Sequence, residues 1–400
     1  MEKQVDVLII GAGISGIGLA VHLSKKCPQR KFEILERRDS FGGTWDLFRY
    51  PGIRSDSDMS TFGFNFKPWA KDKVLASGAE IKGYLSDVIS ENQLKDKIHF
   101  GHRVLSANYD STKKKWLVEI EDNNKKKQNW SANFVIGCTG YYNYDQGYAP
   151  KFPKQEDFKG QFIHPQHWPE NLDYTGKKVV IIGSGATAIT LVPSMVKGGA
   201  GHVTMLQRSP TYIATIPSID FIYEKTRKFM SEETAYKFTR ARNIGMQRGI
   251  YALAQKYPKT VRRLLLKGIE LQLKGKVDMK HFTPSYNPWD QRLCVVPDGD
   301  LFKALREGKA SVETDQIERF TEHGILLKSG KHLDADIIVS ATGLNIQIRT
   351  TTAADSFTVI FTQHSNRPLD YELITNQFFH IELVSLHKRR VLFFFLAFFL

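Results

Sequence analysis

Cysteine is scarce in this 400-residue chain, and no long apolar run is present. The three cysteines, Cys27, Cys138 and Cys294, lie far apart and form no Cys-x-x-Cys pair. This spacing argues against a disulfide scaffold, a zinc ribbon and a dithiol redox centre, and we expect no metal site. No stretch reaches the roughly 18–20 apolar residues of a membrane span, and the first residues show no secretory cleavage pattern. A cytoplasmic protein without a transmembrane span is expected.

Negative charge is also in short supply. The chain has 56 Lys and Arg against 42 Asp and Glu, a net charge of +14, and residues 221–280 alone hold 15 basic and 5 acidic side chains. Helical spacing there separates an apolar side (Val261, Leu264, Leu265 and Ile269) from a basic side (Arg262, Arg263 and Lys267). The segment is either a solvated helical face or a positive rim that attracts an anionic cofactor or a lipid surface. We expect no nucleic-acid partner, and peripheral membrane contact stays open.

Two segments share one pattern, an apolar strand followed by a glycine-rich turn and a helical pattern. Residues 5–16 read VDVLIIGAGISG, and residues 179–188 read VVIIGSGATA. The first glycine of each turn permits the tight bend, the second lets a pyrophosphate approach the backbone, and the third small residue lets helix and strand pack closely. The candidate phosphate-binding residues are Gly11, Gly13 and Gly16 in the first turn and Gly183, Ser184, Gly185, Thr187 and Ala188 in the second.

The residue that ends the second strand of each unit distinguishes the two ligands. Glu36 and Arg208 lie at the same distance along the chain from the first glycine of their own turn. An acid at this place accepts hydrogen bonds from a ribose hydroxyl, whereas an arginine pairs with a 2′-phosphate. The first unit therefore suits FAD or NAD. The second suits NADP, with Ser209 as an additional donor.

Two later apolar strands, at residues 133–140 and 336–343, both end in Thr-Gly and would close the two units. The second strand follows a hairpin-like stretch from Ile325 to Leu333. Between the units stand four prolines that exclude a continuous helix and predict an extended linker. They are Pro150, Pro153, Pro165 and Pro169.

The predicted fold is α/β, with two Rossmann-like dinucleotide-binding domains of the FAD/NAD(P) type and a helical insertion. Residues 1–148 plus 336–400 would form an FAD-binding domain whose C-terminal part looks incomplete. Residues 149–335 would form an NADP-binding domain with the basic helical insertion at about 215–290.

The linker carries a motif that connects this fold to chemistry. Residues 158–168 read FKGQFIHPQHW, with Phe158, Gly160, His164 and Trp168 at the fixed positions of F-x-G-x-x-x-H-x-x-x-W. Together with GGTWDLFRYPGIRSDSDM (42–59) and NPWDQRLC (287–294), this motif resembles the Baeyer–Villiger flavin monooxygenases, which are class B flavoprotein monooxygenases. The pieces look especially like the ethionamide-activating type. The resemblance extends from residue 5 to about 347.

The resemblance implies an FAD- and NADPH-dependent monooxygenase. Such enzymes use a C4a-peroxyflavin to insert one oxygen atom of O₂ into a ketone, and S-oxidation of sulfides or thioamides is a further expectation. Arg292 matches the family's active-site arginine, whose permanent charge would stabilise the anionic peroxide. Asp56 matches the acid that orients this arginine.

The resemblance also implies roles for residues outside the catalytic pair. His164 is interpreted as an element that couples cofactor binding to domain rotation, and Gln291 stands where many relatives have a Lys that contacts the 2′-phosphate. Arg54 and Ser55 would lie near the nicotinamide. The remaining cofactor-binding residues implied are Thr44, Trp45, Asp46 and Val104.

The C-terminal segment departs from this pattern. Residues 344–400 contain none of the chain's 30 glycines but nine of its 26 phenylalanines. A frameshifted or misjoined end is the favoured interpretation; a divergent tail and a short hydrophobic membrane contact are the alternatives. A chain that retains NADP binding without flavin-dependent activity is therefore the competing function. A pyridine nucleotide–disulfide reductase would need a reactive dithiol, which the three separated cysteines do not supply. The sequence leaves the oligomeric state open between a monomer and a homodimer.

Overall fold

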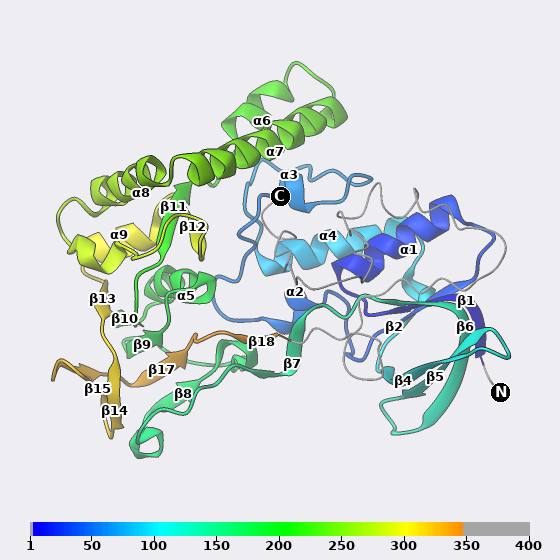
Figure 1. Ribbon diagram of the computed structural model, residues 1–400, viewed down its shortest axis with the longest axis horizontal. Helices are drawn as coiled ribbons and strands as arrows, with labels where there is room; N and C mark the ends of the chain where they lie inside the picture. Colours follow the sequence, from blue (N-terminus) through cyan, green and yellow to red (C-terminus); the bar gives the residue numbers. More distant parts are fainter. Residues whose placement is uncertain (1–2, 347–400) are drawn as a thin grey trace.

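The first glycine turn belongs to a six-stranded sheet in the computed structural model, which describes residues 3–346 (Figure 1). The predictions for residues 347–400 lie outside the described residues. The strand order is β3 (Ile98–His99), β2 (Phe32–Leu35), β1 (Lys3–Ile10), β6 (Lys127–Gly137), β5 (Lys115–Glu121), β4 (Arg103–Asp110). Strands β3, β2, β1 and β6 run parallel, whereas β5 pairs antiparallel with both β6 and β4.

Two helices pack on the parallel part of this sheet: α1 (Ile14–Lys26) and α4 (Gly78–Glu91) (Figure 1). Apolar side chains at helical spacing, among them Ile17 and Val21, are fully buried against the sheet. Helix α4 begins with a capping box between Ser77 and Glu80, which satisfies two backbone N–H groups at its start. The short helices α2 (Thr44–Leu47) and α3 (Met59–Phe62) precede α4 in the chain.

The second glycine turn belongs to a five-stranded, wholly parallel sheet. Its order is β13 (Ala310–Thr314), β10 (His202–Gln207), β9 (Lys178–Ile182), β17 (Ile337–Ser340), β8 (Gln161–Ile163). Helices α5 (Ala186–Lys197) and α9 (Asp300–Arg306) pack against it. The parallel part of the first sheet and the wholly parallel second sheet, each packed against helices, confirm the predicted α/β fold class.

The extended linker is predicted only in part. No continuous helix forms, but the connector contributes β8 to the edge of the second sheet and makes short 3₁₀ turns at Gln155–Asp157 and Pro165–His167. Proline is tolerated beside an edge strand because only one side of that strand needs hydrogen-bond donors. The connector is therefore part of the second domain's sheet.

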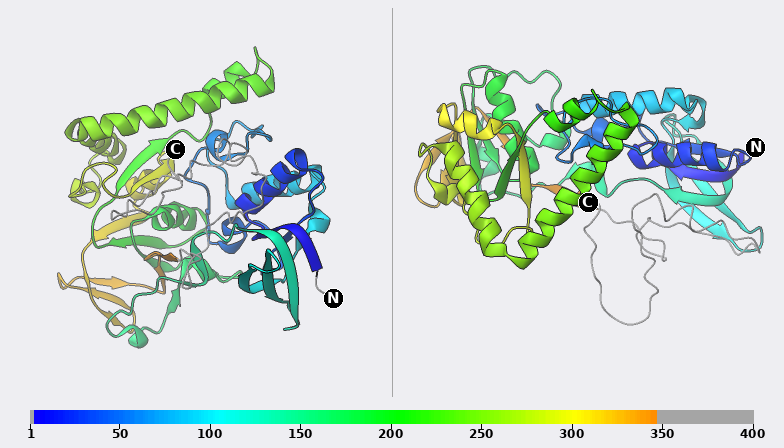
Figure 2. Two further views of the ribbon diagram at one scale, coloured as in Figure 1. Left: turned by 45° about the vertical axis from the view of Figure 1, so that its right-hand side comes forward. Right: turned by 90° about the horizontal axis from the view of Figure 1, so that it is seen from above.

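A helical insertion separates two strands that pair in parallel, β11 (Tyr212–Ile216) and β12 (Leu293–Pro297). It consists of α6 (Phe221–Thr226), α7 (Glu232–Lys256), α8 (Pro258–Leu273) and a 3₁₀ turn at Met279–Phe282. Seen from above, α7 and α8 form the two arms of a V (Figure 2).

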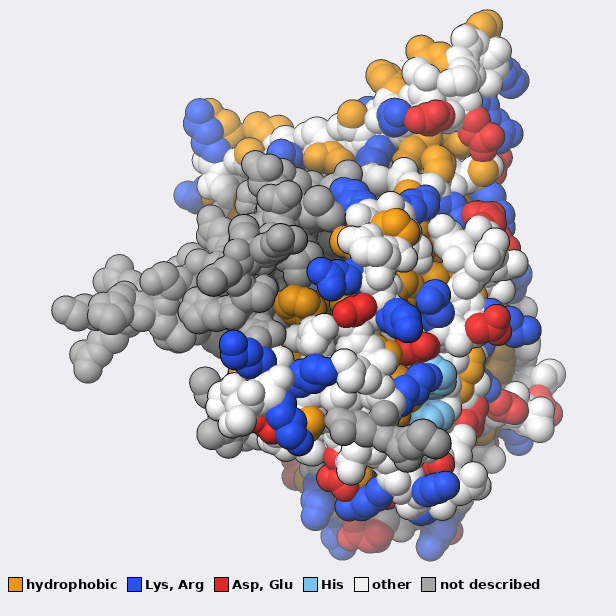
Figure 3. Space-filling view, turned by 90° about the vertical axis from the view of Figure 1, so that its right-hand side faces the viewer, with side chains coloured by type: hydrophobic (Ala, Val, Ile, Leu, Met, Phe, Trp, Pro, Cys, Tyr) orange, Lys and Arg blue, Asp and Glu red, His pale blue; other side chains and the backbone are white. Residues whose placement is uncertain are grey.

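The basic side chains of the insertion have two different surroundings. Arg242 pairs with Asp220, and Arg240 and Arg262 donate hydrogen bonds within the protein. Apolar side chains gather at the projecting end of the insertion (Figure 3), where Phe229 is 87% exposed. Part of the insertion's positive charge is therefore engaged by carboxylates, hydroxyls and carbonyls of the protein itself. Contact of the insertion with a lipid surface stays a prediction.

Two small sheets complete the described chain. The strands β14 (Ile317–Thr321), β15 (Gly324–Leu327) and β16 (His332–Asp334) are antiparallel, which confirms the expected hairpin. Strand β7 (Tyr142–Gly147), which follows the first large sheet in the chain, pairs antiparallel with β18 (Leu344–Ile346), which follows the second. This β7–β18 ribbon lies between the two large sheets (Figure 1).

Two glycines offer a matched stability test of this fold. Gly183 has φ +137°, and a Cβ there would lie 2.3 Å from the carbonyl oxygen of Ala341. Gly249 lies inside α7, and a Cβ there meets no atom within 4 Å. We expect Gly183→Ala to lower the free energy of unfolding by more than about 2 kcal/mol, since strain and a clash add. Gly249→Ala should raise it by about 0.5–1 kcal/mol. Urea denaturation followed by circular dichroism measures both, and equal stability of the two variants would contradict the geometry.

Candidate cofactor-binding and active site

The first glycine turn leaves no room for side chains. Gly11 has φ +107°, and its Cβ would lie 2.5 Å from the oxygen of Cys138. A Cβ on Gly16 would lie 2.0 Å from the oxygen of Gly11, and Gly13 is the N-cap of α1. The turn therefore presents bare backbone at a helix N-terminus, which is the arrangement that suits a pyrophosphate.

Glu36 lies at the end of β2 beside this turn. Its carboxylate is 6% exposed and accepts hydrogen bonds from the backbone N–H of Ala12 at 2.8 Å and of Arg38 at 3.0 Å. A cavity opens against these residues, with Val104 of β4 on its opposite wall; its lining includes Gly11, Gly13, Glu36, His102, Val104 and Cys138. The structure thus brings the predicted ribose acid and Val104 to one cavity with the glycine turn.

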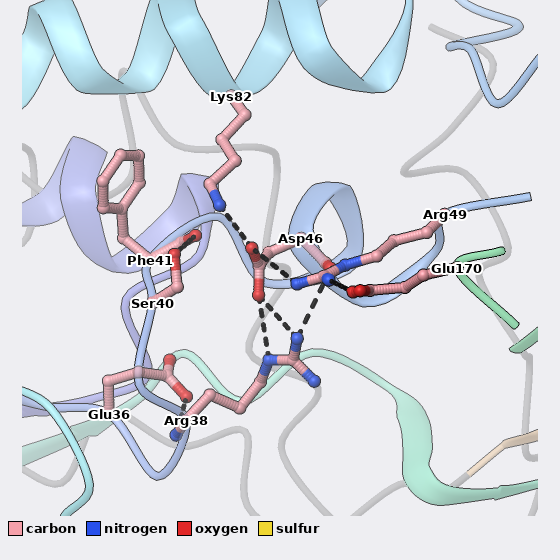
Figure 4. Close-up of polar contacts among 8 residues, drawn as sticks. All are labelled: Glu36, Arg38, Ser40, Phe41, Asp46, Arg49, Lys82 and Glu170. Carbon is pink, nitrogen blue, oxygen red and sulfur yellow. Dashed lines mark hydrogen bonds and ion pairs between the residues drawn. The ribbon is translucent and has the colours of Figure 1, made fainter. Parts of the chain in front are cut away.

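Asp46 is the centre of a buried ion-pair cluster (Figure 4). Its side chain is 2% exposed and pairs with Lys82 of α4, with Arg38 at 2.5 Å and with Arg49 at 3.9 Å. Burial opposes ionisation of Asp46, but hydrogen bonds from Lys82 and Arg38 outweigh it and hold its pKa below the ordinary value. Arg49 also pairs with Glu170 of the connector at 2.6 Å. The cluster therefore ties α2 to α4 and to the linker.

Thr44 and Trp45 belong to the same short helix as Asp46. Tyr144 makes a side-chain hydrogen bond with Thr44, and burial is the main cause that raises the pKa of Tyr144. The Trp45 ring meets Phe62 edge to face at 5.7 Å. Thr44 therefore contacts a residue that lines the cavity, since Tyr144 is part of the lining, whereas Trp45 packs against the core of the first domain.

The second glycine turn repeats the geometry of the first. Gly183 occupies its left-handed position, Gly185 is the N-cap of α5, and Ala188 is fully buried. The buried Ser184 hydroxyl lies 3.0 Å from that of Thr211 and donates to the Ser209 carbonyl at 3.3 Å. The predicted pyrophosphate turn is again a backbone cradle at a helix N-terminus.

Three predicted NADP contacts lie at the open side of this turn. Arg208, which follows β10, is exposed, as is Ser209. Gln291 is exposed on the loop that carries Arg292. Within residues 3–346, no hydrogen bond or ion pair engages the guanidinium of Arg208. Its five donors are therefore available to a ligand.

Arg292 lies directly against the second glycine turn. A Cβ on Gly185 would come within 2.9 Å of Arg292 Nη1. The guanidinium of Arg292 acts on the buried thiol of Cys294, and so does the carboxylate of Asp56. Arg292 and Asp56, which come from different domains, thus both lie close enough to Cys294 for their charges to act on its thiol.

Asp56 is the acid that the resemblance expects to orient Arg292, and no ion pair joins the two among the described residues. Asp56 instead experiences the charge of Arg54, and burial raises the pKa of Asp56 to about 6 against this attraction. Ser55, which the resemblance placed near the nicotinamide, is buried and donates to the Ser57 carbonyl at 2.9 Å. Within the described residues, the charge that acts most directly on Asp56 is therefore that of Arg54.

Arg54 is the least satisfied charged side chain of this region. Its side chain is 10% exposed, and Nη1 lies 3.7 Å from Asp300 at the start of α9. Nε and Nη2 are buried without a hydrogen-bond partner. A buried cation with unused donors fits a bound anion or carbonyl group better than it fits an empty interior.

The partly buried Asp56 makes stability depend on pH. A carboxyl whose pKa is higher in the folded than in the unfolded state contributes stability that is fully present below the unfolded value. For Asp56 that contribution is present below about pH 3.8 and is lost as the pH rises to about 6. We expect Asp56→Asn to melt at a higher temperature than the parent at pH 8 and at the same temperature at pH 3.5. Differential scanning calorimetry measures this, with Asp87→Asn as an exposed control; a gap that is constant with pH would exclude the assignment.

The linker motif lies where the two domains join. His164 donates from Nε2 to the Gly343 carbonyl at 3.2 Å and accepts at Nδ1 from the backbone of Gln166. A Cβ on Gly147 would overlap the His164 ring. Burial lowers the pKa of His164, which keeps it neutral as these two hydrogen bonds require.

The other motif residues pack on the second domain. Phe158 meets Phe320 at 6.3 Å, and a Cβ on Gly160 would lie 2.4 Å from the oxygen of Asp336. Trp168 packs against the core of the same domain. The motif therefore fixes the connector to the second sheet at one end and to the domain junction at the other.

Some residues at the site were not predicted from the sequence. Tyr50, whose pKa burial raises to about 12, makes a hydrogen bond with Thr187. Asp300 faces Arg54 across the domain boundary. Tyr50 lies within the matched segment 42–59, so the resemblance could have indicated it as a site residue. No sequence motif surrounds Asp300, so the sequence gives no signal for its role.

Residues 3–346 contain neither a cluster of metal ligands nor a helix suited to cross a membrane. No group of His, Cys, Asp and Glu there is arranged to hold a metal ion. No helix of this region combines the length and the apolar character that crossing a bilayer demands.

Comparison with known proteins places this geometry in a family. Residues 8–246 match the family described as pyridine nucleotide-disulphide oxidoreductase. The chain is 96% identical over 348 residues to "Probable FAD-binding monooxygenase AlmA" of Acinetobacter sp, which covers 87% of this chain and 70% of that protein. It is 53% identical over 349 residues to the FAD-containing monooxygenase EthA of Mycolicibacterium smegmatis, covering 87% and 71%.

Solved structures resemble the fold at lower identity. The open crystal structure of cyclohexanone monooxygenase matches with a TM-score of 0.70 and 21% identity, over 88% of this chain and 77% of that one. Oxidized steroid monooxygenase bound to NADP matches with a TM-score of 0.68 and 24% identity, over 86% and 72%. At these identities the likeness establishes the two-domain fold.

Proposed function

This chain belongs to the FAD-containing monooxygenases, and from that premise we propose that it converts ketones to esters or lactones with O₂ and NADPH. The balanced reaction consumes ketone, O₂, NADPH and one proton and yields ester, water and NADP⁺. The observation that carries the proposal is Arg292, whose guanidinium lies against the second nucleotide turn and acts on the same buried thiol, Cys294, as the carboxylate of Asp56. Oxidation of sulfides or thioamides is the finer alternative substrate class.

The chain's residues fit the two cofactors in different ways. FAD would bind along Gly11, Gly13 and Gly16, with its ribose at Glu36, and NADP would bind along Gly183 and Gly185, with its 2′-phosphate at Arg208. The glycine turns support this because a Cβ at Gly11, Gly16 or Gly183 would clash with a neighbouring backbone carbonyl, so only glycine permits the tight strand-to-helix turn that a pyrophosphate site needs. When bound, the flavin supplies the redox chemistry that reduces O₂ at the expense of NADPH.

The polar residues would orient and stabilise the reacting groups. Arg292 would hold negative charge that develops at the attacking oxygen, because a guanidinium remains protonated and cannot quench it. Arg54, with two unused buried donors, would bind the nicotinamide side of NADP. Asp56 would be protonated below about pH 6 and charged above it.

Disulfide reduction is the alternative that the matched family description raises. It requires a pair of reactive thiols, whereas Cys27, Cys138 and Cys294 are all unpaired. Burial raises the pKa of Cys138 and of Cys294 to about 12, so neither thiol forms a nucleophilic thiolate at neutral pH. The residues favour oxygen transfer over dithiol chemistry.

The visible spectrum of the purified 400-residue protein, before and after addition of FAD, is the first test. Bands at about 380 and 450 nm, usual for a bound flavin, should survive desalting, and NADPH oxidation should then rise on addition of a cyclic ketone. A protein that binds NADPH but takes up no FAD would refute the proposal and support the competing function, NADP binding alone.

A further inference from the structure

Helix α7 of the insertion holds a short helix of the other domain. Asp58, the N-cap of α3, is 7% exposed and accepts hydrogen bonds from Asn243 Nδ2 at 2.9 Å and Gln247 Nε2 at 2.8 Å. It also accepts from the backbone and hydroxyl of Thr61. Four donors satisfy this buried carboxylate, and α7 supplies two of the four hydrogen bonds.

The same helix also holds the other end of α3. Arg240 Nη1 donates to the carbonyl oxygens of Ser60 at 2.8 Å, Thr61 at 3.0 Å and Gly63 at 3.1 Å. These carbonyls at the end of a helix have no partner within it, and a cation is favourable there. Helix α3 has only four residues and is held at both ends by α7.

Helix α8, which continues directly from α7, holds a second loop. Arg262 Nη1 donates to Tyr212 Oη at 2.6 Å and to the carbonyl of Tyr286 at 3.0 Å. Tyr212 Oη donates to the same carbonyl at 2.7 Å, and Tyr286 Oη donates to the carbonyl of Arg292 at 3.2 Å. The loop that carries Arg292 is thus fixed through Tyr286 to α8.

We propose that the α7–α8 insertion is a positioning element that sets Asp56 and Arg292 relative to each other. One arm of the V holds Asp58, two residues beyond Asp56, and the other arm holds the Arg292 loop. The two side chains come from different domains and are not ion-paired, so their spacing depends on what connects their loops. Asn243, Gln247 and Arg262 are the positioning residues. The catalytic meaning of this spacing rests on the proposed function, whereas the mechanical connection does not.

Hydrogen exchange tests the connection without any need for activity. Gln247→Ala should increase amide exchange several-fold in residues 54–63, and Arg262→Ala should do so in residues 284–294. Gln255→Ala on α7 and Arg263→Ala on α8 are exposed controls, and both should leave these segments unchanged. Exchange in β1 and β9 should not change in any variant. Unchanged protection of 54–63 and 284–294, or loosening spread evenly over the protein, would overturn the proposal.

Coupling of NADPH oxidation to product tests the consequence. In Arg262→Ala we expect the amount of ester formed per NADPH oxidised to fall about tenfold, and hydrogen peroxide should form in place of the ester. A displacement of about 1 Å at a reacting group is enough for a loss of this size. NADPH oxidation itself should change less than twofold, and Arg262→Lys should recover part of the coupling. A parallel fall of both rates would indicate a merely structural role. If the parent makes no ester at all, the proposed function fails, and the exchange experiment still decides the connection.

Discussion

Replacing Arg292 by alanine should abolish ester formation while NADPH still reduces the flavin. Arg292 is exposed on its loop and lies against the second glycine turn, so its removal disturbs no core packing. The loss of one preorganised charge that faces developing negative charge costs about 10²–10³-fold in rate. Stopped-flow absorbance measures flavin reduction by NADPH, and gas chromatography of the product measures oxygen transfer.

Arg263 gives the matched control for this result. It is an exposed arginine on α8, so Arg263→Ala removes the same charge from the surface without touching the turn. Arg292→Lys should retain more activity than Arg292→Ala, because it preserves the charge but not the planar donor geometry. Ester formation at the parental rate in Arg292→Ala would show that the assignment of this arginine is wrong.

The second large effect is expected at Arg208. Arg208→Ala should raise the KM for NADPH by about 10- to 100-fold and leave the KM for NADH unchanged, since a hydrogen bond to a charged group contributes about 1.5–3 kcal/mol. The side chain is exposed, and within the described residues nothing else binds it, so the change should not affect folding. Steady-state kinetics with both nucleotides measure the discrimination.

Two neighbouring positions refine the test of Arg208. Ser209→Ala should have a smaller effect than Arg208→Ala, because its exposed hydroxyl could donate only one hydrogen bond and carries no charge. Gln291→Lys should lower the KM for NADPH, because it adds a cation on the exposed loop beside Arg292. An equal rise of KM for NADPH and NADH in Arg208→Ala would place the 2′-phosphate elsewhere.

The nucleotide turns could be predicted from the sequence because their geometry is local. Gly11 and Gly183 each need a positive φ and a bare backbone, and that requirement is visible in the spacing of the residues. Glu36 was found in the same way, since the length of a strand–turn–helix–strand unit fixes where its second strand ends.

Contacts between distant segments could not be predicted in this way. The pairing of Arg54 with Asp300 and of Asp58 with Asn243 depends on how two domains and an insertion pack, and no local pattern encodes it. Strand β8 was assigned to a linker because its prolines suggest irregular structure, although its pairing with β17 makes it part of the sheet. The resemblance placed Asp56 beside Arg292, but the buried Arg54 is the cation that acts on Asp56.

The β7–β18 ribbon has a consequence for how the two domains move. Two domains joined by a single extended strand can rotate freely about that strand, because one backbone connection resists bending and torsion only weakly. Here two crossing strands are hydrogen-bonded side by side, and the His164 ring rests on Gly147 and donates to Gly343 at their junction. A two-stranded ribbon of this kind bends perpendicular to its plane more easily than it twists or bends within its plane. We therefore expect the ribbon to restrict rotation of one nucleotide-binding domain against the other more than a single connecting strand would.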